Sequence, residues 1–291
     1  MVNRVNKMNV RHMLWPDVQL SQVLLKGVGV RMGFKLHTLV VPMAMAVLVS
    51  GCGQKAPENA EVADYVATNR GYVKSPEVTS VAVTAAGELL VTGSALPESR
   101  VRLTSPGGQA YGVTAGGDGR FQASLPQVSG GSFYDLAMEA EGRLMKAEGR
   151  LFVPPASDIG APPRSVLLRP GAAGLPLWPQ AGLLAVVDYD AGGAMAVSGR
   201  TDPGATVDIE IDGQPAVEVR AGDDGVYTAA LPVSGGLRDG TVSVGVHARD
   251  RFETRQVSLR QPAVERAALV SGVWYVDWQI TGGGMQTTVV F

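Results

Sequence analysis

Short segments of alternating apolar and polar residues, separated by turn residues, recur between residues 75 and 262. In residues 206–211, Val207, Ile209 and Ile211 share one side of the chain, and polar residues take the other side. A period of two predicts a half-buried β-strand. Asp212-Gly213 follows and predicts a tight hairpin, because both central positions of that turn need a positive φ. The same reasoning predicts strands at residues 88–91, 100–103, 194–197 and 241–248.

A further alternating segment lies near the C-terminus. In residues 273–280, the side chains of Trp274, Val276, Trp278 and Ile280 fall on one side, and the glycines of residues 281–284 turn the chain. Residues 285–291 then return, which predicts a β-hairpin within residues 263–291. Two strands alone are only marginally stable in water, so their apolar face has to dock on something. Two alternatives stay open: the hairpin packs on the preceding domain, or it forms a partner-binding surface through Trp274, Tyr275, Trp278 and Phe291.

An internal repeat organises the chain. The pattern Val-x-Gly-x-x-x-Pro-x-x-x-Val begins at Val91 and again at Val197, 106 residues later. At the same offset, Asp-Gly-Arg-Phe at residues 118–121 matches Asp-Gly-Val-Tyr at residues 224–227. Such landmarks at constant spacing indicate two copies of one structural unit. We interpret their glycines and prolines as turn residues, not as ligand sites.

This repeat resembles the bacterial Ig-like domains of cell-envelope proteins, which share the Val-x-Gly-x-x-x-Pro-x-x-x-Val strand pair and the Asp-Gly-x-aromatic hairpin. The resemblance covers residues 75–153 and 180–262. It implies an all-β chain with two tandem Ig-like β-sandwich domains, followed by the C-terminal hairpin. The Cys-Trp-Cys core of antibody domains is absent, so the likeness is to the wider sandwich class.

Two connecting segments complete the predicted organisation. Residues 52–74 are polar and suit a tether. Residues 154–179 are rich in proline, which predicts a semi-rigid linker that spaces the two domains. Its apolar stretches at 166–169 and 175–178 are expected to form edge strands or to lie between the domains.

Composition supports this picture. The 37 glycines and 18 prolines among 291 residues exceed the usual share of about 12% and fit many turns and short strands. Charge is unevenly distributed, because 6 of the 25 basic and 1 of the 27 acidic residues precede Gly53. The remaining 19 basic and 26 acidic residues give −7, which argues against nucleic-acid binding.

The start of the chain carries a targeting pattern. Basic residues at 31 and 35 precede an apolar run at 39–49, and Ser50-Gly51-Cys52 follows. A basic region, a short apolar region and small residues define a secretory signal. The run is shorter than the ~20 residues of a membrane-spanning helix, although such a helix with an incidental cysteine is the alternative. We expect translation to start at Met32 and a leader at residues 32–51, and residues 1–31 are then either a wrongly assigned start or a poorly structured extension outside the fold.

Val49-Ser50-Gly51-Cys52 resembles the lipobox of bacterial lipoproteins, and Cys52 is the only cysteine of the chain. This resemblance implies that diacylglycerol is transferred to the Cys52 thiol, that the leader is cut before Cys52, and that several acyl chains anchor the protein to a membrane. Gly53 is not the Asp that favours inner-membrane retention. The resemblance therefore implies an outer-membrane lipoprotein, facing the periplasm.

Residues suited to catalysis or metal binding are few. After Cys52, His247 is the only histidine, and no Gly-x-Ser-x-Gly motif accompanies it. Zinc needs more His or Cys ligands than this. Asp188, Asp190, Asp223 and Asp224 leave calcium open, although the spacing of an EF-hand is absent. We therefore predict no catalytic residue, no metal site and no cofactor.

Together these observations predict a non-enzymatic, lipid-anchored cell-envelope protein. Its partners would be the membrane, through lipid on Cys52, and an envelope protein of a secretion, adhesion or surface-anchoring assembly. The first alternative is binding of a glycan, either peptidoglycan or exopolysaccharide, through exposed Trp178, Trp274, Tyr275 or Trp278. The second is an enzyme that uses the carboxylates of Asp188, Asp190 or Asp223.

Overall fold

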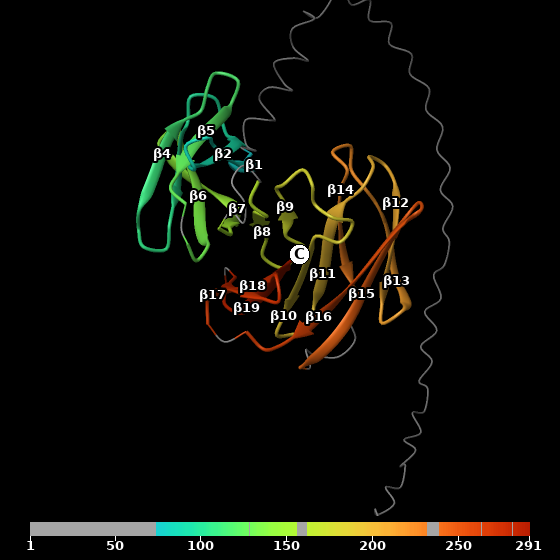
Figure 1. Ribbon diagram of the computed structural model, residues 1–291. Coiled ribbons are helices and arrows are strands. Elements are labelled where there is room, and N and C mark those ends of the chain that lie inside the picture. The colour runs from blue at the N-terminus through green and yellow to red at the C-terminus, as the bar shows by residue number, and fades with distance from the viewer. Residues whose placement is uncertain (1–73, 128, 156–161, 232–238, 263, 281) are drawn as a thin grey trace, which may run out of the picture. The chain divides into compact units, whose positions relative to one another are not determined.

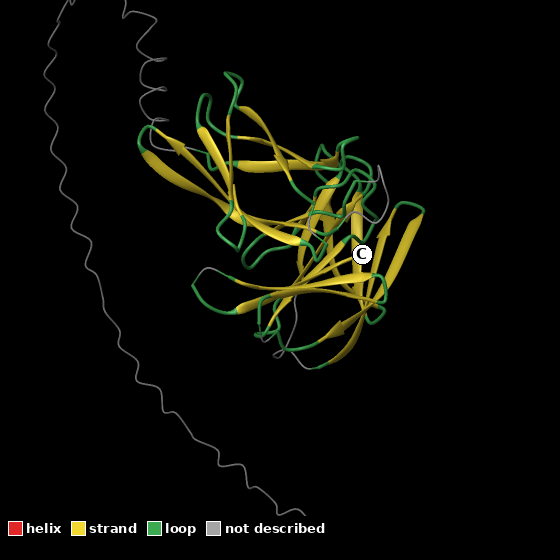
Figure 2. Ribbon diagram, turned by 60° about the vertical axis from the view of Figure 1, so that its left-hand side comes forward, coloured by secondary structure: helices red, strands yellow, loops and turns green. Residues whose placement is uncertain are grey.

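A computed structural model describes residues 74–291 apart from residues 128, 156–161, 232–238, 263 and 281. Every regular element in this part is a β-strand, and all strand pairs are antiparallel (Figures 1 and 2). Among these residues no helix is long and apolar enough to span a membrane. The leader, Cys52 and most of the tether lie outside the described residues.

The first sandwich is built from two sheets that alternate buried and exposed residues. One sheet has the order β1-β2-β5, and strands β4-β3-β6-β7 of a second sheet pack against it. Val91 and Val101 belong to the apolar core between them. The strands are β1 (Glu77–Val83), β2 (Leu89–Ser94), β3 (Arg100–Thr104), β4 (Ala110–Thr114), β5 (Arg120–Leu125), β6 (Ser132–Ala140) and β7 (Arg143–Val153).

The second sandwich repeats this topology, as the sequence repeat predicts. Its strand order β14-β11-β10 matches β5-β2-β1, and β13-β12-β15-β16 matches β4-β3-β6-β7. Val197 and Val207 occupy the core positions equivalent to Val91 and Val101. The chain is therefore all-β with two Ig-like sandwiches. The strands are β10 (Val186–Asp190), β11 (Met195–Arg200), β12 (Thr206–Ile211), β13 (Gln214–Arg220), β14 (Val226–Leu231), β15 (Gly240–Ala248) and β16 (Arg251–Leu259).

The hairpin predicted at Asp212-Gly213 is confirmed. Both residues have positive φ, 50° and 75°, and they join β12 to β13. Gly119 and Gly225 also adopt positive φ, in turns where Asp118 and Asp224 accept backbone N–H groups two residues on. These aspartates and glycines therefore set turns, as predicted.

Gly93 and Gly199 do not lie in turns, which corrects the prediction made for the glycines of the motif. They lie inside β2 and β11, directly opposite Phe121 and Tyr227 on the neighbouring strands. A Cβ on Gly93 would lie 2.3 Å from the Phe121 ring, and one on Gly199 would lie 2.9 Å from the Tyr227 hydroxyl. The two repeat motifs therefore meet in space, because the glycine leaves room for the aromatic ring of the second motif.

The proline-rich segment 154–179 is more than the spacer predicted. It forms β8 (Val166–Leu168) and β9 (Leu175–Pro176), which extend the second sheet of the first sandwich beyond β7. Both alternatives for its apolar stretches are confirmed, because they form strands at the edge of this sheet and also lie between the two sandwiches. The interpretation as a linker that spaces the domains has to be corrected, because Val166, Leu168 and Trp178 are buried against residues of the second sandwich.

The C-terminal strands belong to the second sandwich. β17 (Arg266–Val270), β18 (Val273–Gln279) and β19 (Met285–Val290) continue the β14-β11-β10 sheet, with β19 paired along β10. Tyr275 and Val289 enter the sandwich core. On the opposite face, Val276 and Trp278 pack in the apolar layer that contains Phe152. Of the two alternatives for the hairpin, the structure shows docking on the preceding domain.

Candidate functional site

The aromatic residues expected to bind a partner or a glycan are used mainly for packing. Trp278 is 1% exposed and its indole N–H donates to the Thr288 hydroxyl, while Tyr275 is 8% exposed and its hydroxyl accepts the Ser258 N–H. Trp178 is also buried. These three side chains therefore offer no surface for a partner or a sugar ring.

Trp274 and Phe291 are half-buried. The Trp274 ring lies edge-on to Phe152, with 5.9 Å between the ring centres, and the Arg255 guanidinium lies 5.7 Å from the centre of the Phe291 ring. The sequence carries a signal for this packing. Residues 273–278 are apolar on both sides of the strand except at Asp277, and such a run is typical of a strand covered on both faces.

His247 is a surface residue on β15. Its ring stacks on Phe252 with 4.1 Å between centres, and its Nε2 lies 3.4 Å from an oxygen of Glu210. The neighbours that the structure gives His247 include no serine or cysteine nucleophile, so the geometry assigns it no part in a catalytic triad.

The carboxylates considered for calcium or catalysis are dispersed. Asp190 and Asp224 each accept a backbone N–H within their own turns, at 3.0 Å in both cases, and Asp223 is exposed. Within the described ranges, no three His, Cys, Asp or Glu residues are grouped so that they could hold a metal ion.

Asp188 is the exception, since it is buried at the junction of three segments. One of its carboxylate oxygens accepts hydrogen bonds from the Gln286 amide (3.0 Å) and the Thr288 hydroxyl, and the other accepts the Gly174 N–H at 2.7 Å. Burial raises the pKa of Asp188 to about 6, although these hydrogen bonds and the nearby Arg169 oppose the rise. Asp188 thus fastens the 169–174 segment to the second sandwich.

Asp277 forms a second buried polar cluster on the other face of the same sheet. Its carboxylate accepts hydrogen bonds from Thr287 and Arg260, both at 2.7 Å, and from Arg266 at 3.2 Å. Burial alone would lower the pKa of Arg260, but the hydrogen bond and charge of Asp277 outweigh it and raise that pKa. Both aspartates are saturated with protein partners, so we assign them to structure.

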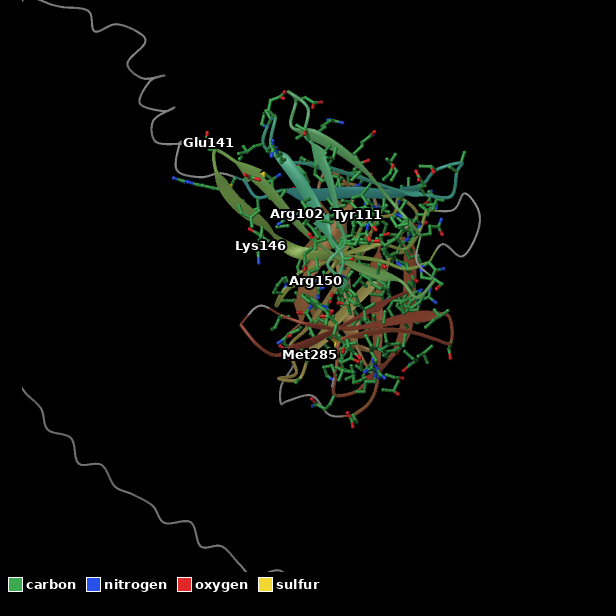
Figure 3. The ribbon with its side chains drawn as sticks, turned by 90° about the vertical axis from the view of Figure 1, so that its left-hand side faces the viewer. Arg102, Tyr111, Glu141, Lys146, Arg150 and Met285 are labelled. Atoms are coloured by element: carbon green, nitrogen blue, oxygen red, sulfur yellow. The ribbon has the colours of Figure 1, made fainter. Side chains whose placement is uncertain are left out.

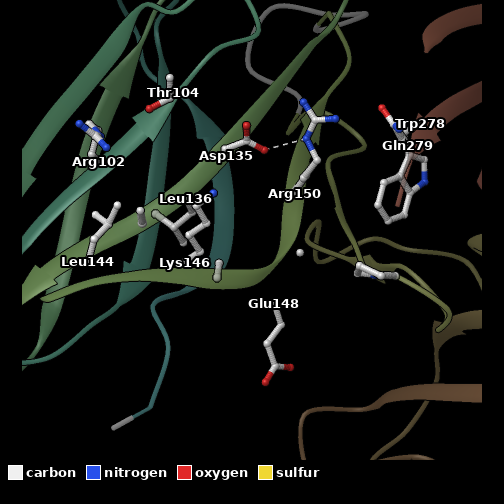
Figure 4. Close-up of a pocket in the computed structure, with 14 residues that line it drawn as sticks. Arg102, Thr104, Asp135, Leu136, Leu144, Lys146, Glu148, Arg150, Trp278 and Gln279 are labelled. Carbon is white, nitrogen blue, oxygen red and sulfur yellow. Dashed lines mark hydrogen bonds and ion pairs between the residues drawn. The ribbon is translucent and has the colours of Figure 1, made fainter. Parts of the chain in front are cut away.

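One of several depressions open to a ligand lies on the outer face of the first sandwich, across β3, β4, β6 and β7. Two adjoining depressions of about 320 and 340 Å³ share Arg102, Ala137 and Leu144, and we call them together the basic groove. Figure 3 shows Arg102, Lys146 and Arg150 on this side of the first sandwich. Figure 4 shows the part of the groove that reaches Trp278 and Gln279 of β18.

Strand alternation creates the groove. β3 buries Val101 and Leu103 and turns Arg100, Arg102 and Thr104 outward. Across the ladder, Arg102 faces Gly112 on β4 and Ala137 on β6. Because both neighbours are small, the sheet is hollow on either side of the arginine.

The charges of the groove are only partly satisfied. Arg150 is paired with Asp135 (2.8 Å) and Glu265 (2.7 Å). Within the part of the chain that the structure describes, Arg100, Arg102 and Lys146 have no ion-pair partner, although Glu139 and Glu148 also line the groove. Such a surface can hold carboxylate or other anionic groups by charge-assisted hydrogen bonds. Sequence reasoning predicted this strand but missed the groove, because its members come from strands far apart in the chain.

Comparisons with known proteins add little. No family model matches the chain, and no curated protein matches it. Among solved structures, the chain is similar to a structure described as "Biofilm associated protein - BSP domain", with 16% identity and a TM-score of 0.21. The match covers 65% of this chain and 30% of that one, so this chain spans less than a third of that protein. A likeness of this size carries no argument about function.

Proposed function

We propose that the protein is a non-enzymatic, lipid-anchored component of the bacterial cell envelope that binds an acidic protein partner through the basic groove. The observation that carries the proposal is the open groove with three unpaired cations, Arg100, Arg102 and Lys146. The lipobox-like segment that ends at Cys52 supports the anchor and the outer-membrane location.

The form of the groove favours binding over catalysis. Its lining contains arginine, lysine, threonine and aliphatic side chains together with the carboxylates of Asp135, Glu139 and Glu148, and no histidine or cysteine. It lies open on a sheet face rather than in a closed cleft, where reacting groups would be desolvated. Only Trp278 supplies an aromatic ring to the lining, and that ring is buried, so stacking on a sugar is not favoured.

The anchor is tested by labelling cells with a radioactive fatty acid. The wild-type chain should be labelled and should fractionate with membranes, and the Cys52→Ser variant should lose the label. A Cys52→Ser protein that keeps the label would overturn the anchor.

The groove is tested by placing a photo-crosslinking amino acid at Leu144, which is 56% exposed at the groove. Crosslinking in intact cells should give an adduct that is lost when Arg102→Glu and Lys146→Glu are added. The matched control carries the crosslinker at Gln122, an exposed residue of β5 in the opposite sheet. Equal adducts from both positions, or adducts insensitive to the charge reversals, would contradict a role of the groove.

A further inference from the structure

The two sandwiches present equivalent outer faces that carry opposite charges at the centre of the third strand of each copy. At the repeat offset of 106 residues, β3 corresponds to β12, and the buried Val101 and Leu103 match Val207 and Ile209. The outward residue between them is Arg102 in the first sandwich and Asp208 in the second. The core of the repeat is thus preserved while the exposed charge at this position is inverted.

The face around β12, which we call the acidic face, concentrates carboxylates. Asp208 lies directly opposite Glu218 on β13, and Glu210 lies two residues along the same strand. Like charges opposite each other in a ladder are destabilising, so this arrangement costs the isolated chain stability. Its neighbouring basic residues are His247, which is 3.4 Å from Glu210, and Arg220, which pairs with Thr206 in the ladder. Asp208 and Glu218 have no ion-pair partner among the described residues.

Each face also exposes one large apolar side chain at the same place in the fold. Leu144 is the second residue of β7 and Phe252 is the second residue of β16, and they are 56% and 58% exposed. Phe252 is held in place by the stacked His247 ring. A contact between the two faces would bury an apolar residue from each side beside complementary charges, which is the usual composition of a protein interface.

We propose that the basic groove of one copy of this chain binds the acidic face of a second copy. This inference rests on the proposed function and identifies the acidic partner as the protein itself. The contact joins different surfaces, so each pair keeps one free groove and one free acidic face and can grow into a row or close into a ring. Tethering in one membrane raises the effective concentration of the copies, so a weak contact is sufficient.

The test uses the full chain, purified in a non-ionic detergent and measured by sedimentation velocity. Copies should associate at about 50 mM salt and separate at about 500 mM, because salt screens exposed charges. Arg102→Glu and Asp208→Arg should each weaken association by about tenfold or more, since each places like charges face to face. The double variant should restore it. Arg164→Glu, which reverses an exposed charge outside both faces, should change nothing.

Two results would overturn the inference. One is a wild-type chain that stays monomeric at low salt, and the other is a double variant that associates no more strongly than the two single variants. If either single variant melts at a lower temperature than the wild type, Lys146→Glu and Glu218→Lys provide a second charge-reversal pair. The Leu144 crosslink separates this inference from the proposed function. If the purified chain is monomeric and the crosslink in cells joins it to a different protein, self-association is rejected. The groove then still acts as a binding site, as the proposed function states.

Discussion

Gly199 shows how a single residue connects the two repeat motifs. Its missing side chain makes room for Tyr227, whose hydroxyl donates a hydrogen bond to the Leu183 carbonyl. A Cβ at Gly199 would stand 1.9 Å from that carbonyl oxygen, and because the oxygen belongs to the backbone it cannot move aside as the end of a side chain would. Burial also raises the pKa of Tyr227, so the ring stays neutral and the hydrogen bond is kept across the physiological range.

We therefore expect Gly199→Ala to lower the free energy of unfolding by about 3 kcal/mol, the upper part of the range for overpacking. Gly240→Ala is the matched control. Gly240 lies on β15 of the same sandwich, and a Cβ there would meet nothing within 4 Å. Urea denaturation of the two variants measures the difference. Equal stability of both would mean that the strand glycine is not required for packing.

Asp188 should make stability depend on pH. Its folded pKa of about 6 lies above its ordinary value of 3.8, so the folded chain takes up this proton first as pH falls. The contribution to the free energy of unfolding is then fully present below about pH 4 and is lost as pH rises through about 6, with an upper limit of about 3 kcal/mol.

The Asp188→Asn variant cannot titrate at this position. Urea denaturation at pH 4.5 and pH 7 should show the wild type gaining stability relative to the variant at the lower pH. The comparison cancels the titration of other carboxylates, because they are present in both proteins. A stability difference that is the same at both pH values would show that Asp188 does not titrate in this interval.

At the scale of the element, the three C-terminal strands are an internal part of a sheet. β19 lies between β10 and β18, and both of its faces are covered, by Tyr275 and its neighbours on one side and by Trp278 and its neighbours on the other.

Deleting residues 266–291 should therefore unfold the second sandwich. Limited proteolysis should show rapid cleavage after residue 180 in the truncated chain and resistance in the intact one. A truncated chain that keeps its protease resistance would return the hairpin to the role of a separate module.

The sequence predicted much at this scale, and the reasons for its failures are physical. Period-two alternation and Asp-Gly turns are local signals, so the strands and the hairpin at Asp212 could be predicted from them. Where the hairpin docks depends on β10, about a hundred residues earlier in the chain, and no local pattern encodes that pairing. The prolines of the 154–179 segment led to the prediction of a linker. In the structure, burial of Val166 and Leu168 fixes this segment against the second sandwich.

At the scale of the molecule, one apolar layer couples the two sandwiches. Phe152 of β7 is fully buried, and it contacts Phe133 of its own sheet and Trp274 of the second sandwich. Arg150 reaches Glu265 beside this layer with an ion pair of 2.7 Å. The sandwiches should therefore unfold together rather than independently.

Calorimetry tests this coupling. The wild type should unfold in one transition, and Phe152→Ala, which costs about 3–5 kcal/mol for a buried aromatic ring, should separate it into two. Phe252→Ala is the control, because Phe252 is an exposed aromatic residue that lies outside the layer. Two transitions already in the wild type would show that the layer does not couple the sandwiches.

The order of strands along the chain also bears on how the protein is made. The contact between Asp188 and Thr288 spans 100 residues, so the sheet that contains β10 stays incomplete until β19 has been synthesised. The equivalent sheet of the first sandwich differs in this respect, because its strand β1 pairs only with the next strand of the chain, β2. Pairing over such long separations is slow, which lengthens the time that the nascent chain remains open. For an exported chain, as proposed above, this delay would keep the second half in a state able to thread through a translocation channel.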